Sequence, residues 1–339
     1  MKIDGIDRDL FALFGLIAVV TLGVAWVLSH GVLHWGDIVS SYFQIGFLSL
    51  LVGLIPRVVF PTFQASRTGK SPLAEVYKSL TDPKLWVWLA VPGFIAPIFM
   101  AAFTITKTLI GIKLGFTWDD YFAELDRVIF GTDPWRYTHA VFGTEMGSKF
   151  LQFWYVGWGV PVAFSMPLVV VLAGREHAAK FLLAMFLTWA MAGLCLAALF
   201  ASAGPCFAGE FNPVLKERFA PLNDQLTLLL KDGPIQMTQH YLAKYWNAKV
   251  AVKGGGISAF PSVHVAVAVL YVIASWRKPL LRYASLFFAM TIWIGSIHFG
   301  YHYAVDGIAS VGIAYAAWTI ASKAVAFIAS RHQPAVALA

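Results

Sequence analysis

Three ionisable residues in the last third of the chain, His264, His302 and Asp306, have types and spacing that suit catalysis. His302 and Asp306 are four residues apart, so on a helix their side chains lie on the same face. The carboxylate can then accept one ring N–H and leave the other imidazole nitrogen basic. The spacing therefore predicts nucleophilic chemistry at His302, with Asp306 orienting its ring.

A second polar segment leads from three glycines at 254–256 through Pro261 and Ser262 to His264. Glycines followed by proline and serine are typical of a helix N-terminus, where free N–H groups and the helix dipole favour an anion such as phosphate. In the alternative interpretation, the glycines form only a flexible loop and Ser262 only caps the helix. We predict that Gly256 and Ser262 contribute to a phosphate-binding site.

The composition indicates which elements must position these residues. Hydrophobic residues make up 59% of the 339 and charged residues 13%, and the mean hydropathy is +0.69. A soluble globular protein carries about a quarter charged residues, so this chain could not cover a water-facing surface. The net charge of +7 does not require a nucleic-acid partner, because basic residues collect in the cytoplasmic loops of membrane proteins.

Long apolar segments predict an all-α polytopic membrane bundle of about eight helices. The sixth is short because Pro261 and the segment 277–279 bound it. The predicted spans are 10–33, 41–60, 86–110, 151–173, 179–203, 262–276, 281–299 and 303–329.

The charges between the spans predict the orientation in the membrane. Basic residues gather in the loops that share one side: Arg57, Arg67, Lys70, Lys78, Lys84, Arg175, Lys180, Arg277, Lys278 and Arg282. The positive-inside rule predicts that both termini are cytoplasmic and that segments 111–150 and 204–261 are extracytoplasmic loops. His264, His302 and Asp306 would then lie at the outer face of a cell (inner) membrane.

Two stretches of these outer loops are apolar at helical spacing, 118–130 and 221–232. Each is expected to form a helix, which either lies on the membrane surface or packs against the bundle.

The two cysteines do not suggest a disulfide framework. Cys195 lies inside an apolar run and is expected to be a buried thiol.

The motifs resemble those of the type 2 phosphatidic acid phosphatase superfamily. Pro261-Ser262-Val263-His264 resembles its Pro-Ser-Gly-His motif, and His302 with Asp306 resembles its nucleophilic His followed by Asp. The resemblance implies that His302 attacks phosphorus to give a phosphohistidine, that Asp306 orients it and that His264 protonates the leaving oxygen. It also implies chemistry that uses no metal or other cofactor, with membrane lipids as the donor and the acceptor.

Two departures from the family pattern favour one branch. Ser296 stands where the family's phosphatases carry an arginine, and no clear Lys-x6-Arg-Pro motif is present, although Lys216, Arg218 and Lys253 are nearby bases. In both departures the chain resembles the branch of inositol phosphorylceramide synthase and its bacterial relatives. Further matches to that branch are Leu125-Asp126-Arg127, Gly131 through Trp135, Gly204-Pro205-Cys206 and Arg218-Phe219-Ala220-Pro221.

The resemblance implies a six-helix phosphatase or phosphotransferase core at 86–330, preceded at 1–85 by two added transmembrane helices and a basic cytoplasmic loop. We predict a lipid phosphotransferase. The residues predicted to bind its substrate are Ser262, Gly256, Lys253, Arg218, His298 and Tyr303.

Three alternatives remain open at this point. The first is a lipid or isoprenoid phosphate phosphatase, in which water is the acceptor. The second is a transporter with an intramembrane proton relay, for which Lys107, near a predicted span end, is the main buried charge. The third is a zinc site, because His298 lies four residues before His302, with His264 and Asp306 near.

Overall fold

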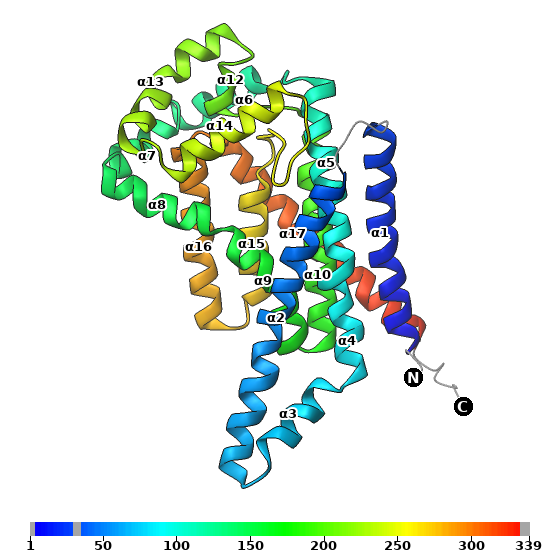
Figure 1. Ribbon diagram of the computed structural model, residues 1–339. Helices are drawn as coiled ribbons and strands as arrows, with labels where there is room; N and C mark the ends of the chain where they lie inside the picture. The colour runs from blue at the N-terminus through cyan, green and yellow to red at the C-terminus, as the bar shows by residue number, and fades with distance from the viewer. Residues whose placement is uncertain (1–3, 30–34, 333–339) are drawn as a thin grey trace, which may run out of the picture.

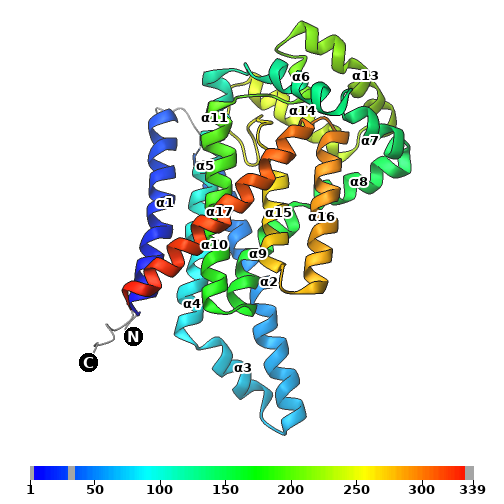
Figure 2. The same cartoon turned by 180° about the vertical axis from the view of Figure 1, so that it is seen from behind.

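The computed structural model describes residues 4–29 and 35–332, and every regular element in these ranges is helical (Figures 1 and 2). Seven helices are long and apolar enough to cross a membrane, and an eighth apolar helix, α15, is shorter. The all-α polytopic fold class is therefore confirmed, and the protein is an integral membrane protein.

The seven candidate spans and the shorter helix α15 follow the predicted spans with shifted ends. They are α1 (Gly5–Ser29), α2 (Trp35–Thr68), α4 to α5 through a π-helical turn (Pro83–Leu114), α8 and α9 (Glu145–Gly157, Gly159–Leu172), α10 to α11 through a second π-helical turn (Arg175–Leu199), α15 (Val263–Ser275), α16 (Pro279–His298) and α17 (Ala304–Arg331). The predicted end of the first span, 30–33, lies outside the described residues.

The largest difference from prediction is in α2, which continues well beyond the predicted end at 60. The helix contains Pro56 and Pro61 and runs on to Thr68. After it, α3 (Pro72–Leu80) folds back against α2. Much of the segment 61–85, between the second and third predicted spans, is therefore helical, because neighbouring turns accommodate prolines that would otherwise end a helix.

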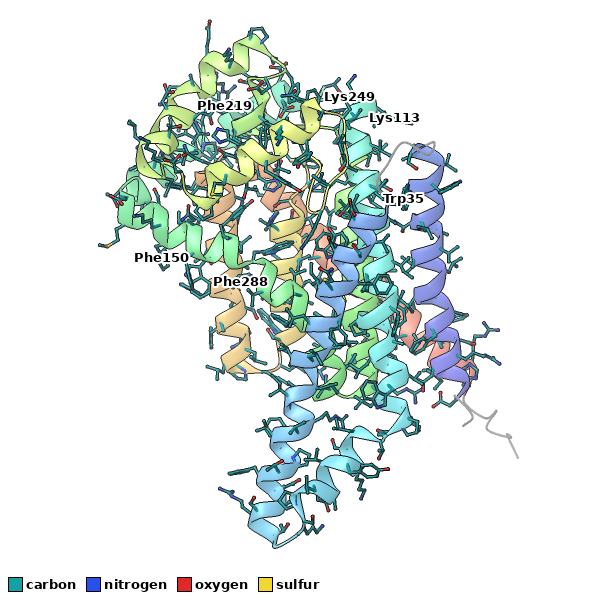
Figure 3. All side chains as sticks on the ribbon, in the orientation of Figure 1. Trp35, Lys113, Phe150, Phe219, Lys249 and Phe288 are labelled. Atoms are coloured by element: carbon teal, nitrogen blue, oxygen red, sulfur yellow. The ribbon has the colours of Figure 1, made fainter. Side chains whose placement is uncertain are left out.

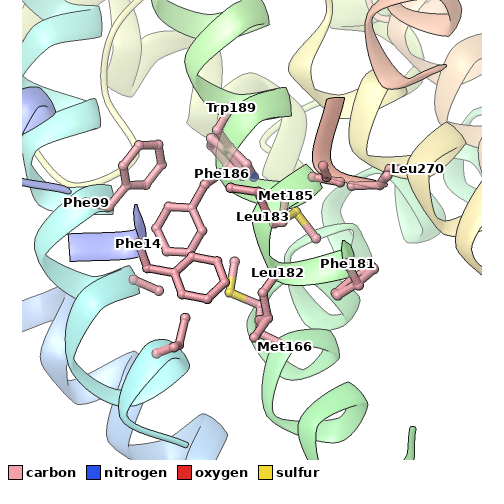
Figure 4. Packing of buried hydrophobic residues seen from close by; sticks show 14 of the residues in the cluster. Phe14, Phe99, Met166, Phe181, Leu182, Leu183, Met185, Phe186, Trp189 and Leu270 are labelled. Carbon is pink, nitrogen blue, oxygen red and sulfur yellow. The ribbon is translucent and has the colours of Figure 1, made fainter. Parts of the chain in front are cut away.

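The core of the bundle surrounds α10, which is buried along most of its length (Figure 4). Phe186 of α10 packs between Phe14 of α1 and Phe99 of α5, with ring centroids 5.8 and 4.8 Å away. Such aromatic pairs add to the stability that apolar burial supplies. The added helix α1 thus shares one core with the helices that follow.

The segments predicted as outer loops are mostly helical and gather at one end of the bundle. They form α6 (Asp119–Phe130), α7 (Trp135–Phe142), α12 (Pro205–Ala208), α13 (Pro213–Leu229) and α14 (Pro234–Asn247). Both described ends of the chain and α3 lie toward the opposite end (Figures 1 and 2). Figure 3 shows Lys113, Phe219 and Lys249 at the end that carries α6 and α13, while Phe288 of α16 lies nearer the middle of the bundle.

Two of these helices correspond to the apolar stretches at 118–130 and 221–232. The predicted helix at 118–130 is confirmed as α6, whereas the second belongs to a longer helix, α13, which ends at Leu229. Phe122 of α6 and Leu222 of α13 are buried in one apolar cluster, so both helices pack against the protein.

The prediction that Cys195 is buried is wrong, because this residue is exposed on the bundle surface. Neither cysteine forms a disulfide.

Candidate active site

His302 lies in the short connection between α16 and α17, at the end of the bundle that carries α6 and α13. Its Nδ1 is 2.7 Å from the carbonyl oxygen of Ala259 and 3.2 Å from Oδ2 of Asp306. Both neighbours are acceptors, so Nδ1 carries the proton and Nε2 is the unprotonated nitrogen of the neutral ring. His302 is only 5% exposed and lines a cavity of about 290 Å³.

Asp306 is fully buried in the first turn of α17. Its Oδ2 accepts the backbone N–H of Tyr303 at 3.0 Å as well as the ring N–H of His302. These bonds keep the carboxylate beside the ring. His302 precedes α17, so the contact forms because Asp306 turns back over the N-terminus of the helix and not because the two residues share a helix face. Burial lowers the pKa of His302 to about 3, so the imidazole is neutral and able to act as a nucleophile near pH 7.

His264 lines the same cavity, in the first turn of α15. Its ring is 5.9 Å from that of His302 between centroids, and it lies against Tyr155 and Trp158 at 5.1 and 4.2 Å. Neither of its nitrogens has a hydrogen-bond partner within 4–29 and 35–332, so both are available to a ligand. The structure therefore brings His264 and His302 together across one cavity, although they are far apart in the sequence.

Of the residues predicted to bind substrate, Gly256 lines this cavity, together with Gly254 and Ser258 of the same loop. Ser262 does not, because it is fully buried and its Oγ accepts the N–H of Val265 as the cap of α15. Lys253 is exposed outside the cavity. The alternative interpretation, in which Ser262 is only a helix cap, is the one the geometry supports.

Two further residues that we expected at the pocket, Arg218 and Tyr303, have other partners. Arg218 is paired with Asp133 and donates to the carbonyl of Ala123 at 2.6 Å. Tyr303 is buried and donates its hydroxyl to Asp119 at 2.9 Å. The prediction that Arg218 and Tyr303 line the pocket is therefore wrong. Each long side chain turns toward an acceptor that the sequence does not reveal.

His298 is also fully buried and points away from the cavity. Its Nε2 is 2.9 Å from Oγ of Ser148, and its ring packs on that of His139 at 4.2 Å. Within the described ranges, no group of three or more His, Cys, Asp or Glu side chains is arranged to hold a metal ion. The zinc interpretation loses its basis, since His298 and His302 do not converge.

Two buried carboxylates of α6 hold the backbone around the site, a role that the sequence did not predict. Asp119 accepts the N–H groups of Ala203 and Gly204 at 2.8 and 2.9 Å. Asp126 accepts those of Ala304 and Val305 at 2.8 and 3.0 Å, at the N-terminus of α17. Carboxylates stabilise a helix N-terminus by satisfying its free N–H groups and by interacting with its dipole.

The carboxylate of Asp119 is linked to His302 through the backbone. The residue before Ala203, Ser202, accepts the N–H of Ala259 on its carbonyl oxygen at 2.8 Å and the N–H of Phe260 on its Oγ at 3.0 Å. The carbonyl of Ala259 in turn fixes the ring of His302. A chain of buried hydrogen bonds thus runs from α6 to the imidazole.

An apolar helical bundle with two histidines facing one cavity, one of them oriented by a carboxylate, defines a membrane protein equipped for nucleophilic chemistry. Comparison with protein families gives a match to the PAP2 superfamily over residues 121–320, and the chain belongs to that superfamily. Comparisons with curated proteins and with solved structures gave no match. Membership suggests phosphatase or phosphotransferase activity on lipid phosphates.

Proposed function

We propose that the protein transfers a phosphoryl or phospho-head group from a lipid donor to an alcohol acceptor, through a phosphohistidine at His302. The observation that carries the proposal is the pair of rings facing one cavity, with Nδ1 of His302 fixed by Ala259 and Asp306. Nε2 is then the nitrogen that meets a substrate in the cavity, opposite His264.

In the first step, Nε2 of His302 attacks phosphorus and the bond from phosphorus to the leaving oxygen breaks. His264 donates a proton to that oxygen, and Asp306 stabilises the positive charge on the phosphorylated imidazole. A bound phosphate favours the protonated form of His264, since an anion beside an imidazole stabilises its cation. General acid catalysis of this kind is typically worth about 10²–10⁴-fold.

In the second step, His264 takes the proton of the incoming alcohol, whose oxygen attacks phosphorus and releases His302. Water in the same place would make the protein a phosphatase. Aromatic side chains of the cavity lining, Tyr155, Trp158, Phe207 and Tyr301, favour an organic acceptor over water. Ser296 in place of the arginine of the family's phosphatases supports the same choice and the resemblance to inositol phosphorylceramide synthase.

We also propose that this chemistry takes place on the extracytoplasmic side of a cell membrane, with a phospholipid as donor and a lipid alcohol as acceptor. The basic residues Arg57, Arg67 and Lys70 belong to α2 and the turn after it, at the end of the bundle opposite α6 and α13 (Figure 1). The positive-inside rule assigns that end to the cytoplasm, together with both termini.

The test is an assay of purified protein with phosphorus-labelled phospholipids in a membrane lipid extract. We expect label in a new phospholipid, and none of that product with His302→Ala. His240→Ala replaces an exposed histidine of α14 and is the matched control, expected to have full activity. Free phosphate as the sole labelled product would support the phosphatase instead. Equal turnover by His302→Ala would exclude His302 as the nucleophile.

A further inference from the structure

Lys107 is a charged side chain of the cavity whose role the sequence did not reveal. It lies on α5, whose last residue is Leu114, and so it is nearly two turns inside the helix rather than at its end. It lines the same cavity as His264 and His302. The residues lining this cavity include no carboxylate, and Lys107 forms no ion pair within the described part of the chain.

An ammonium group withdrawn from water without a counter-ion is costly, by several kcal/mol in order of magnitude. A protein retains such a group where a ligand supplies the opposite charge. Among the residues that the structure describes, this cavity is lined by one lysine, two histidines and no acid, so its ligand is expected to be an anion.

Packing holds Lys107 in this position. Gly256 has φ of +91°, and a Cβ added there would lie 3.1 Å from Cγ of Lys107 and 3.0 Å from the backbone nitrogen of Thr108. The glycine loop therefore rests on the stem of the lysine, which only a residue without a side chain allows. Tyr42 of α2 is bonded to Thr104, one turn earlier on α5, at 2.5 Å between oxygens, which ties α2 to the same helix.

The positive charge of Lys107 lowers the pKa of His302, the candidate nucleophile. Burial is the largest cause of this lowering, and Lys107 is the second largest. The other bases considered from the sequence are placed elsewhere, because Arg218 is paired with Asp133 and both Lys216 and Lys253 are exposed. Lys107 is thus the cation that shares the cavity with both rings.

We propose that Lys107 binds the non-bridging oxygens of the phosphoryl group that is transferred. Lys107 then takes the place of the arginine that the family's phosphatases carry at the position of Ser296. The proposal rests on the proposed function, and it adds a residue from outside the segment 121–320 that matches the family. The two added helices then have a role in the site, since α1 and α2 pack on α5. The substrate group is a phosphate ester with at least two free oxygens facing α5.

The kinetic test compares Lys107→Met, Lys107→Arg and the control Lys113→Met. Lys113 lies on the same helix but is exposed at its end (Figure 3). Losing a donor to the charge that develops in the transition state costs about 10²–10³-fold, so we expect Lys107→Met to lower kcat/KM by that factor. Lys107→Arg should keep more activity than Lys107→Met, and Lys113→Met should behave as the wild type. A value of kcat/KM within threefold of wild type for Lys107→Met would overturn the proposal.

A second measurement does not depend on turnover. Melting temperatures are compared in inorganic phosphate and in chloride at equal ionic strength. Phosphate should stabilise the wild type and Lys113→Met but not Lys107→Met, and without phosphate Lys107→Met should melt no lower than the wild type. A phosphate shift that survives in Lys107→Met, or is absent in the wild type, would count against the lysine. Loss of the shift in Lys107→Met with no turnover of any lipid phosphate by the wild type would instead refute the proposed function.

Discussion

Asp126 offers the most direct test of how the fold holds the site, because one side chain caps the helix that carries Asp306. Its two carboxylate oxygens accept the N–H groups of Ala304 and Val305 at 2.8 and 3.0 Å, and the residue is only 3% exposed. Asp126→Ala leaves both donors buried and unsatisfied. Each such donor costs about 1–3 kcal/mol, so the free energy of unfolding should fall by about 2–6 kcal/mol.

The same side chain predicts how stability depends on pH. Burial raises the pKa of Asp126 to about 7 from 3.8, against the effect of the two backbone N–H groups. Between these values the folded protein holds a proton that the unfolded chain has lost, so this residue's contribution makes stability fall as pH rises from 4 to 7. At about 1.4 kcal/mol per pKa unit, the full change is about 4 kcal/mol.

The assay is the melting temperature of the purified protein between pH 5 and pH 7.5, with turnover measured beside it. Asp126→Asn cannot titrate, so its melting temperature should fall less over this range than that of the wild type. Asp224→Asn, an exposed position on α13, is the matched control and should follow the wild type. Both Asp126 variants should lose activity, since Asp306 follows the capped residues directly.

Two results would refute this reasoning. The first is the same pH dependence of melting in Asp126→Asn and in the wild type, which would mean that the carboxyl group does not titrate between pH 4 and 7. The second is full stability and turnover in Asp126→Ala, which would mean that the N-terminus of α17 does not need this cap.

Three further predictions follow from the site and its surroundings. His264→Ala should lose about 10²–10⁴-fold in rate with a lipid phosphate but far less with an aryl phosphate, whose phenolate leaves without a proton; equal losses on both would rule out the acid role. Single cysteines placed at Lys253 and at Lys70 in a cysteine-free background should react with a membrane-impermeant reagent from outside only at 253, and labelling at 70 in sealed cells would invert the topology. Tyr303→Phe removes the hydroxyl that donates to Asp119 and should lower the free energy of unfolding by about 1–3 kcal/mol, and an unchanged denaturation midpoint would show that this bond is not needed.

The sequence alone predicted what depends on composition and short spacing. Long apolar runs identify membrane helices because a bilayer excludes unpaired backbone groups and charges whatever the rest of the fold is. The four-residue step from His302 to Asp306 predicted that the two side chains meet, and Nδ1 of His302 lies 3.2 Å from Oδ2 of Asp306, although His302 precedes the helix that carries Asp306. His264 could be assigned to the start of a helix because proline and serine precede it.

The sequence could not predict which polar groups satisfy one another. Arg218 was expected at the phosphate and is paired with Asp133, while His298, four residues before His302, is bonded to Ser148. Spacing determines the direction of a side chain only within its own helix. Its partner depends on how the helices pack, and a buried polar group turns to whichever partner that packing provides.

Lys107 shows most clearly the difference between what the local sequence predicts and what only the tertiary structure decides. In the sequence it is one lysine in an apolar run. Its chemistry depends on two histidines more than 150 residues away, and on the fact that the described residues lining its cavity include no carboxylate. Only the tertiary packing, in which the glycine loop lies against α5, brings the three side chains to one cavity. Helix formation is local and can be inferred from the chain, whereas the field inside a cavity is the sum of groups that only the tertiary structure brings together.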